Sequence, residues 1–269
     1  MALRLPSSLS PSKVSSFTSC ALAFKFSSLL RVPEPPTVAA SKGTLVHTTL
    51  ENLFLLPSDE RTLDAAYEIL DRASDDFHGE ADYQGLELDE SAAKKFEREA
   101  KKLVEKYFKL EDPTRITPVG LELRMEAQIG DLRLRGIIDR LELDEDGGLV
   151  VTDYKTGRTP MAQFEQSKLG GVHFYAFMVE QLFGRRPSKV QLLHLADPVA
   201  IINTPTEQSI RGLSKRVSAI WVAITRACER DDFRPKPGKL CDWCSYKPFC
   251  PAHGGDPSLA PTEVEVSIT

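Results

Sequence analysis

Apolar and polar residues alternate in the middle of the chain, between Leu121 and Lys155. The run LELRMEAQI alternates up to Ile129, a Gly-Asp turn follows, and LRLRGIID alternates again up to Asp139. The segment DEDGG then turns the chain into LVVTDYK, which is apolar almost to its end. Because the side chains of a strand point to its two faces in turn, this pattern predicts a three-stranded antiparallel meander whose third strand is buried.

Helical spacing dominates the rest of the chain. Ser10 can cap a helix that starts at Pro11, and the small and aromatic residues after it predict two short helices around Cys20. A region at about residues 58–112, rich in lysine, glutamate and alanine, predicts a solvated helical insertion. The other predicted elements are helices over Ser41–Leu55, Glu60–Asp76, Ser91–Leu110, Gln163–Leu182 and Glu207–Arg230, and a strand over Val190–Leu195.

The third predicted strand ends in an aspartate and a lysine two positions apart. Asp153 and Lys155 therefore face the same way, and Asp139, at the end of the second strand, is placed to come beside Asp153. Two converging carboxylates can hold Mg²⁺, and a lysine beside them can orient a water molecule and offset charge on a phosphoryl group. A lone D-x-K is most often a surface ion pair. The apolar strand before it, the glycine after it and the second carboxylate favour a catalytic site.

The segment GIIDRLELDEDGGLVVTDYKTG resembles the core of the PD-(D/E)XK nuclease superfamily, and specifically its RecB-like branch. That branch also has a histidine in a G-x-x-x-H helix, which GTLVH matches with His47. The resemblance extends from about Ser10 to Pro251. It implies that Mg²⁺ or Mn²⁺ is bound by His47, Asp139, Asp153 and the backbone carbonyl of Tyr154, and that the catalytic residues are Lys155, Asp153 and Asp139.

One part of the family pattern is changed in this chain. Relatives follow D-Y-K with a helix that bears Q-x-x-x-Y, whose glutamine and tyrosine lie near the DNA. Tyr175 in HFYAFM matches the tyrosine, but Gly171 stands where the glutamine is expected. Gln166 could compensate only if the helix begins differently. Tyr175 is therefore a further candidate catalytic residue, and the role of the glutamine stays open.

Three cysteines are clustered late in the chain, in CDWCSYKPFCP. In a reducing compartment such a cluster indicates a metal site rather than disulfides. A C-x-x-C pair fits half of a zinc site or a redox pair, and spacing alone does not separate a zinc knuckle from an iron-sulfur cluster. The clustered residues are Cys241, Cys244 and Cys250, and the candidates for a fourth ligand are Cys20, Cys228 and His253.

The resemblance favours one of these alternatives. A subset of RecB-like nucleases, including the bacterial AddB subunit and CRISPR-associated members, has one cysteine near the start and three near the end, which together hold a [4Fe-4S] cluster. SKVSSFTSCALAFKF resembles the first part of that arrangement, with Ala21 in place of the usual proline. Cys228 is then expected to be a small core residue. The resemblance implies a structural [4Fe-4S] cluster bound by Cys20, Cys241, Cys244 and Cys250.

The charge balance limits how the chain can bind DNA. Its 269 residues include 34 basic and 39 acidic ones, a formal net charge of -5. A nuclease of this composition needs a local basic cleft rather than a basic surface. No stretch reaches the ~18 apolar residues of a membrane span, and the N-terminus lacks the apolar core of a secretory signal, so we expect a cytoplasmic protein without a membrane partner. The candidate cleft residues are Arg133, Arg135, Arg140, Lys155 and Arg158.

Patterns and resemblance together imply an α/β protein with a restriction-endonuclease-like core. The expected parts are a mixed sheet with a three-strand antiparallel meander flanked by helices, a helical insertion, and an iron-sulfur cluster segment that joins the two termini. We expect a single RecB-like nuclease domain over residues 1–251, with its core at about 117–206 and the cluster segment at 240–251 with Cys20, followed by a tail over 252–269.

The expected activity is metal-dependent hydrolysis of DNA by a single-strand exonuclease that acts in DNA repair or recombination. No G-x-x-x-x-G-K-[ST] phosphate loop is present, which favours a standalone nuclease. The alternative is a catalytically inactive DNA- or partner-binding module that retains the nuclease fold, and Gly171 is its best support. A cluster-dependent redox protein ranks last, because no motif for an electron-transfer partner is present.

Overall fold

The computed structural model describes residues 3–159 and 165–261, with only the backbone over 165–170. The chain divides into two compact units. The terminal unit comprises Met1–Pro35, Glu126–Gly136 and Arg211–Thr269, and the sheet unit comprises Pro36–Met125 and Ile137–Ile210. The expected organisation as one nuclease domain stays a prediction.

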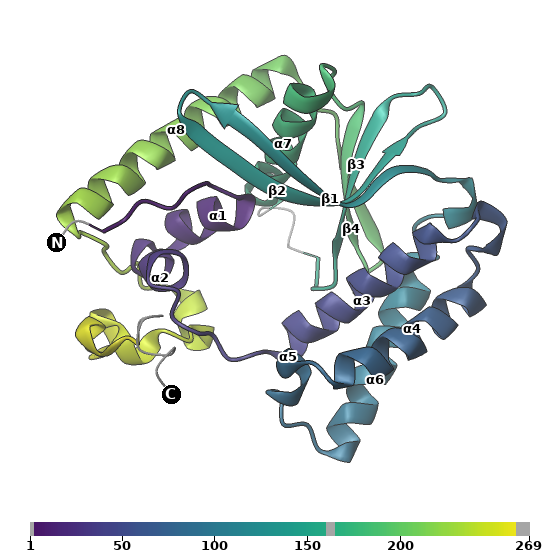
Figure 1. Ribbon diagram of the computed structural model, residues 1–269, viewed down its shortest axis with the longest axis horizontal. Coiled ribbons are helices and arrows are strands. Elements are labelled where there is room, and N and C mark those ends of the chain that lie inside the picture. The colour runs from purple at the N-terminus through teal and green to yellow at the C-terminus, as the bar shows by residue number, and fades with distance from the viewer. Residues whose placement is uncertain (1–2, 160–164, 262–269) are drawn as a thin grey trace. The chain divides into compact units, whose positions relative to one another are not determined.

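Five strands form a mixed sheet in the order β1-β2-β3-β4-β5 (Figure 1). Their bounds are β1 Thr117–Ile129, β2 Leu132–Leu143, β3 Leu149–Lys155, β4 Lys189–His194 and β5 Val199–Asn203. β2 and β3 pair antiparallel, with Arg140 opposite Thr152, whereas β3 and β4 pair parallel, with Asp153 opposite Leu192. The predicted mixed sheet is confirmed, and all three strands of the predicted meander are present.

Two details of the sheet differ from the sequence prediction. Asp139 does not end β2, because Leu141 and Leu143 continue the strand opposite Val151 and Leu149. β5 was not predicted: it pairs with β4 at the edge of the sheet and leaves Ile202 exposed, so no apolar alternation marks it.

The helix α7 (Glu165–Phe183) connects the parallel strands β3 and β4. Parallel neighbours need such a crossover, because a short turn cannot return the chain to the same end of the sheet. Buried residues of α7 include Val172, Phe174 and Met178. The predicted start at Gln163 lies outside the described residues.

α3 and the helices of the insertion pack together within the sheet unit, and α3, α4 and α6 begin and end within three residues of the prediction. Their bounds are α3 Val38–Leu55, α4 Leu63–His78, α5 Ala81–Gln84 and α6 Glu90–Tyr107. α3 begins three residues before the predicted Ser41 because the Thr37 hydroxyl accepts a hydrogen bond from the Ala40 N–H and so caps the helix earlier. Leu50, Leu70 and Val104 belong to one buried core shared by α3, α4 and α6.

The terminal unit contains short helices that precede and follow Cys20, as predicted. α1 (Pro11–Ser19) is capped by Ser10, whose hydroxyl accepts from the Lys13 N–H at 3.2 Å, and α2 (Ala21–Phe24) follows. Its remaining elements are η1 Lys25–Leu29, α8 Glu207–Arg230 (which enters it from the sheet unit), η5 Lys239–Trp243, η6 Lys247–Phe249, η7 Pro251–His253 and η8 Pro257–Leu259.

Two short helical turns, η2 (Ser58–Glu60) and η3 (Pro113–Arg115), flank the helical insertion. At the other end of the chain, the expected loose tail from residue 252 begins as the ordered turns η7 and η8, and its residues 262–269 lie outside the described part. Within the part of the chain that is described, none of the helices combines the length and the apolar character needed to cross a membrane.

Candidate metal centre

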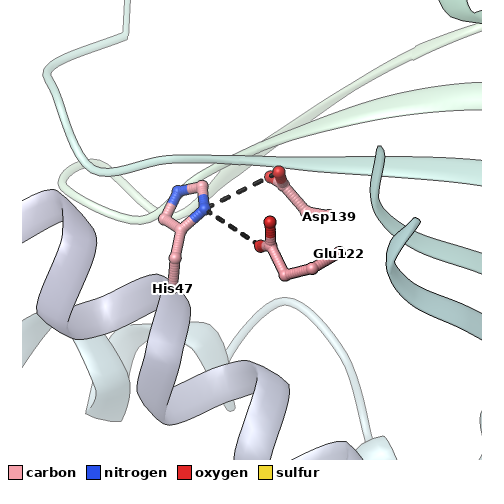
Figure 2. A group of neighbouring side chains, drawn as sticks. All are labelled: His47, Glu122 and Asp139. Carbon is pink, nitrogen blue, oxygen red and sulfur yellow. Dashed lines mark ion pairs between the residues drawn. The ribbon is translucent and has the colours of Figure 1, made fainter. Parts of the chain in front are cut away.

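Three metal-binding side chains converge in the sheet unit: His47 from α3, Glu122 from β1 and Asp139 from β2 (Figure 2). The Nδ1 atom of His47 lies 3.6 Å from Asp139 Oδ1 and 3.9 Å from Glu122 Oε1. One ligand atom of each residue lies within 4.8 Å of the other two. An imidazole nitrogen with two carboxylate oxygens is a donor set that divalent cations such as Mn²⁺ accept.

β3 brings a further carboxylate beside this group. Asp153 is only 6% exposed, and the next residue, Tyr154, donates its backbone N–H to Asp139 Oδ2 at 2.6 Å. In an extended strand the N–H and C=O of one residue point to the same side, so the Tyr154 carbonyl is also directed toward β2. This arrangement supports Asp153 and the Tyr154 carbonyl as ligands, and their metal binding stays a prediction.

Lys155 lies at the end of β3 on the same face as Asp153, as the alternation predicted. Its Nζ atom forms an ion pair with Asp153 Oδ2. The lysine side chain is 45% exposed and the aspartate side chain 8% exposed. The pair is therefore not an ordinary surface ion pair, because one partner is buried at the sheet and the other reaches solvent.

Negative charge is concentrated at this point of the sheet. Burial raises the pKa of Asp139 to about 7, with a further contribution from Asp153, against the opposing effects of His47 and Lys155. Burial lowers the pKa of His47, but the hydrogen-bonding carboxylate of Glu122 and the charges of Asp139 and Asp153 outweigh it, so the pKa is raised. The raised pKa values of Asp139 and His47 indicate that nearby positive charge does not balance the charge of the carboxylates. A bound cation would balance it.

Glu122 was not among the residues predicted from the sequence. Its backbone has φ of 41°, a conformation that non-glycine residues rarely adopt, in the middle of β1. Around it the alternation of exposed and less exposed positions stops, since Leu121, Glu122 and Leu123 are all half-buried. In the sequence Glu122, Arg124 and Glu126 are equivalent polar positions of an alternating run. Only the distorted backbone distinguishes Glu122, so no sequence signal could have selected it.

Arg140, expected in a DNA-binding cleft, is instead fully buried. Strand alternation places Arg140 on the face of β2 opposite to Asp139, where Tyr107 and Tyr154 are also buried. Its guanidinium donates to both carboxylate oxygens of Glu111 at 3.0 and 2.8 Å and to the Tyr154 hydroxyl at 2.7 Å, and it forms an ion pair with Glu142. Arg140 thus links β2 to β3 behind the metal centre and cannot contact DNA.

The other cleft candidates fall in different units. Arg158 is exposed in the sheet unit, whereas Arg133 and Arg135 belong to the terminal unit, where Arg135 pairs with Glu126 at 2.8 Å. A cation that sequence reasoning missed, Arg124, lines a cavity of about 560 Å³ together with His47 and Glu122.

The first turns of α3 contact the loop after β3 at the rim of this cavity. A Cβ atom added to Gly43 would lie 3.1 Å from the Thr156 hydroxyl, so glycine allows the close approach. Gly43 belongs to the GTLVH segment and Thr156 to DYKTG. Their contact explains why the helix with His47 can pack against the strand end with Lys155.

Tyr175 of α7 is close enough to the carboxylates for their charges to affect its pKa. Burial raises the pKa of its hydroxyl, and Asp153, Asp139 and Glu122 raise it further. The group is therefore a neutral hydrogen-bond donor at physiological pH. A Cβ atom on Gly171 would meet nothing within 4 Å, so there is room for a larger residue where relatives have glutamine. The Gln166 side chain lies outside the described residues.

The four cysteines that were expected to bind iron line one cavity of the terminal unit. Its volume is about 440 Å³, and Cys20, Cys241, Cys244 and Cys250 all face it. Burial raises the pKa of the Cys244 thiol, and the other three thiols raise it further against a hydrogen bond from the Tyr246 backbone. Cys228 lies elsewhere, buried in α8, as expected for a core residue.

The described thiols do not form a compact group of ligand atoms. A single zinc ion, with Zn–S bonds of about 2.3 Å in a tetrahedron, holds its sulfur atoms roughly 4 Å apart. Among the described residues, no three of the cysteines and His253 bring ligand atoms within 4.8 Å of one another.

A mixed sheet that brings a histidine, three carboxylates and a lysine close together is an arrangement typical of metal-dependent nucleases. The sequence matches the PD-(D/E)XK nuclease superfamily over residues 8–251, and the chain belongs to this family.

A solved structure shares the fold: a candidate exonuclease from Eubacterium rectale has a TM-score of 0.58 at 14% identity, covering 89% of this chain and 88% of that chain. The structure of SSO0001 has a TM-score of 0.37 at 14% identity over 87% of this chain and 93% of that chain. Among curated proteins, no sequence matches this chain.

Proposed function

We propose that this chain is a Mg²⁺- or Mn²⁺-dependent deoxyribonuclease of the RecB-like type that degrades single-stranded DNA from an end, in DNA repair or recombination. The observation behind the proposal is the convergence of His47, Glu122 and Asp139 beside the buried Asp153 and the half-exposed Lys155. The solved structure with the higher TM-score is described as a candidate exonuclease, which supports the exonuclease assignment. Cytoplasmic location belongs to the same proposal.

The metal would be held by His47, Glu122, Asp139, Asp153 and the Tyr154 carbonyl. When bound, it polarises the scissile phosphate and lowers the pKa of a water molecule. Lys155, which pairs with Asp153 beside the candidate ligands, would orient the attacking water and offset charge on the phosphate. Tyr175 donates a hydrogen bond from its neutral hydroxyl, and Arg124 contacts a phosphate of the incoming strand.

We assign a [4Fe-4S] cluster to Cys20, Cys241, Cys244 and Cys250. The shared cavity, the lack of any three of these ligand atoms within 4.8 Å of one another among the described residues, and the effect of the other thiols on the Cys244 pKa support this assignment. Cys20 and the C-terminal cysteines are far apart in the sequence, so a cluster between them restricts the unfolded chain and stabilises the terminal unit. Its role is therefore structural.

Cleavage of end-labelled oligonucleotides tests the proposed activity. Protein purified without oxygen should shorten linear single strands progressively when Mn²⁺ is present, and should leave a circular single strand intact because it has no end. Asp139→Asn, which replaces a ligand by a group of the same size, is the matched control and should be inactive. Absence of cleavage by folded, iron-loaded wild-type protein would favour the inactive DNA- or partner-binding module, for which the glycine at position 171 is the specific observation.

The Asp139 pKa of about 7 predicts how metal binding depends on pH. In the unfolded chain an aspartate ionises near pH 3.9, so ionising Asp139 in the folded protein costs stability as the pH rises toward 7, and a bound cation removes this cost. Below pH 7 a proton competes with the cation. We expect the Mn²⁺-induced rise in Tm to be clearly larger at pH 8 than at pH 6, with apparent affinity changing up to about tenfold per pH unit below 7.

Differential scanning fluorimetry of metal-stripped protein, titrated with Mn²⁺ at both pH values, checks this expectation. Asp139→Asn cannot titrate at that position and should show a small rise in Tm at either pH. Equal Mn²⁺ effects on wild-type protein at pH 6 and pH 8 would contradict the assignment of Asp139 as a ligand.

A further inference from the structure

The segment that carries the three C-terminal cysteines has one aromatic side chain that is not packed into the unit. Tyr246 is buried against Phe26, with ring centroids 5.4 Å apart, and its hydroxyl donates to Glu34 at 2.6 Å. Phe249 also packs on Phe26, at 6.0 Å. Trp243, at the end of η5, is 79% exposed. The segment thus has two aromatic anchors and one large ring presented to solvent.

Trp243 has no part in holding the cysteine cavity. Lys239, Leu240, Cys241 and Lys247 line that cavity, but Trp243 does not. Filling the cavity with a cluster would therefore leave the indole ring exposed. Leu240, three positions before Trp243 in the 3-10 helix η5, is 72% exposed, so the two side chains leave apolar surface in contact with water.

The sequence segment that contains Trp243 has a net charge opposite in sign to that of the whole chain. From Arg234 to Cys250 there are four basic residues and one acidic residue, a net charge of +3, whereas the whole chain has a formal net charge of -5. Arg234 is paired with Asp232, so the exposed positive charge comes from lysines. Within the described residues, Lys239 and Lys247 form no ion pair, and Lys236 donates to the Thr18 carbonyl at 3.2 Å, which leaves its charge uncompensated.

We propose that Trp243, together with Leu240, Lys239 and Lys247 at the rim of the cysteine cavity, forms a surface that binds single-stranded nucleic acid, in addition to the metal centre. An aromatic ring stacks on any unpaired base, and lysines beside it attract the phosphates, which is the combination that sequence-independent single-strand binding uses. Paired bases in a duplex hide their faces, so the surface selects single strands. An acidic protein partner would satisfy the lysines but would not need the flat exposed ring.

This inference rests on the proposed function for its biological use, but it can fail separately. Lysines near a cluster with four thiolates could serve only to balance its negative charge, whereas Trp243 has no such use. The decisive variant is therefore Trp243→Ala. Leu259→Ala is the matched control, because Leu259 is 71% exposed on η8 and is not part of the proposed surface.

The experiment measures fluorescence anisotropy of labelled oligo-dT with full-length, iron-loaded protein and no added divalent cation, so that binding is read without cleavage. Trp243→Ala should weaken binding about fivefold or more, Trp243→Phe should retain most of it, and Leu259→Ala should bind as the wild type does. Lys239→Ala should lower the salt dependence of binding by about one unit of log-log slope. All variants should keep the iron content of the wild type.

A second measurement observes the ring itself. The chain has two tryptophans, so Trp221→Phe leaves Trp243 as the single reporter, and oligo-dT should change its emission. Wild-type affinity of Trp243→Ala for oligo-dT would overturn the inference even if the protein cleaves DNA, and so would an unchanged emission. Self-association lost in Trp243→Ala with unchanged DNA binding would assign the surface to a second copy of the chain. Trp243-dependent binding by a protein that cleaves nothing would overturn only the nuclease proposal.

Discussion

Lys155→Ala is expected to reduce Mn²⁺-dependent cleavage of single-stranded DNA by about a hundredfold or more while the protein stays folded and keeps its iron. The substitution removes the ammonium group that pairs with Asp153 and that we propose orients the attacking water. It removes no candidate metal ligand. The side chain is 45% exposed, so its loss leaves no cavity in the core.

Single-turnover cleavage and Mn²⁺ titration by thermal shift distinguish this loss from a loss of metal. Lys155→Ala should still respond to Mn²⁺, whereas Asp153→Asn should lose both the response and the activity. Arg158→Ala changes an exposed cation in the same unit three positions away, and it is expected to keep most of the activity. Wild-type cleavage by Lys155→Ala would show that Asp153 and Lys155 are a structural ion pair and would remove the basis of the proposed mechanism.

The alternating runs of the sequence predicted the part of the site that depends on strand periodicity. Asp153 and Lys155 share a face because two residues separate equivalent positions of a strand, and Asp139 comes beside them because β2 and β3 are neighbours in the meander. His47 could be placed only through the resemblance of GTLVH to a family motif, since nothing in its own helix distinguishes a ligand from a core histidine. The positions of these residues are consistent with the sequence prediction.

The features that the sequence did not predict depend on backbone distortion and on burial. Glu122 reaches the site from a residue with positive φ, and a pattern of polar positions carries no information about one distorted residue. Arg140 looked like a DNA-binding cation because arginine is rarely buried. Inside the protein, however, Glu111 and Glu142 compensate its charge, and two tyrosine hydroxyls accept hydrogen bonds from it. Long-range partners of this kind cannot be read from a local pattern.

Cys250→Ala is expected to show the opposite behaviour to Lys155→Ala: it should lose the iron first and stability with it. Wild-type protein prepared without oxygen should be brown and contain stoichiometric iron and acid-labile sulfide. Removing one of four thiolates opens the cluster to solvent and oxidation. Cys250 is also a fixed point of the terminal unit, because its carbonyl accepts from the Gly255 N–H at 2.9 Å and a Cβ on Gly255 would collide with Pro248.

The expected loss of stability results from chain entropy. A cluster that joins Cys20 to Cys250 closes a loop of 230 residues, which in a simple cross-link treatment restricts the unfolded chain by on the order of 5 kcal/mol. Iron analysis, the visible spectrum and Tm should therefore change together in Cys250→Ala. Cys228→Ala is the matched control: this thiol is buried in α8 and does not line the cavity, so the variant should stay brown and lose only the small packing contribution of one sulfur atom. A colourless wild-type protein with one tightly bound zinc ion would contradict the cluster assignment. So would full iron content in a variant that lacks both Cys250 and His253, because His253 is the other candidate ligand that lines the cavity.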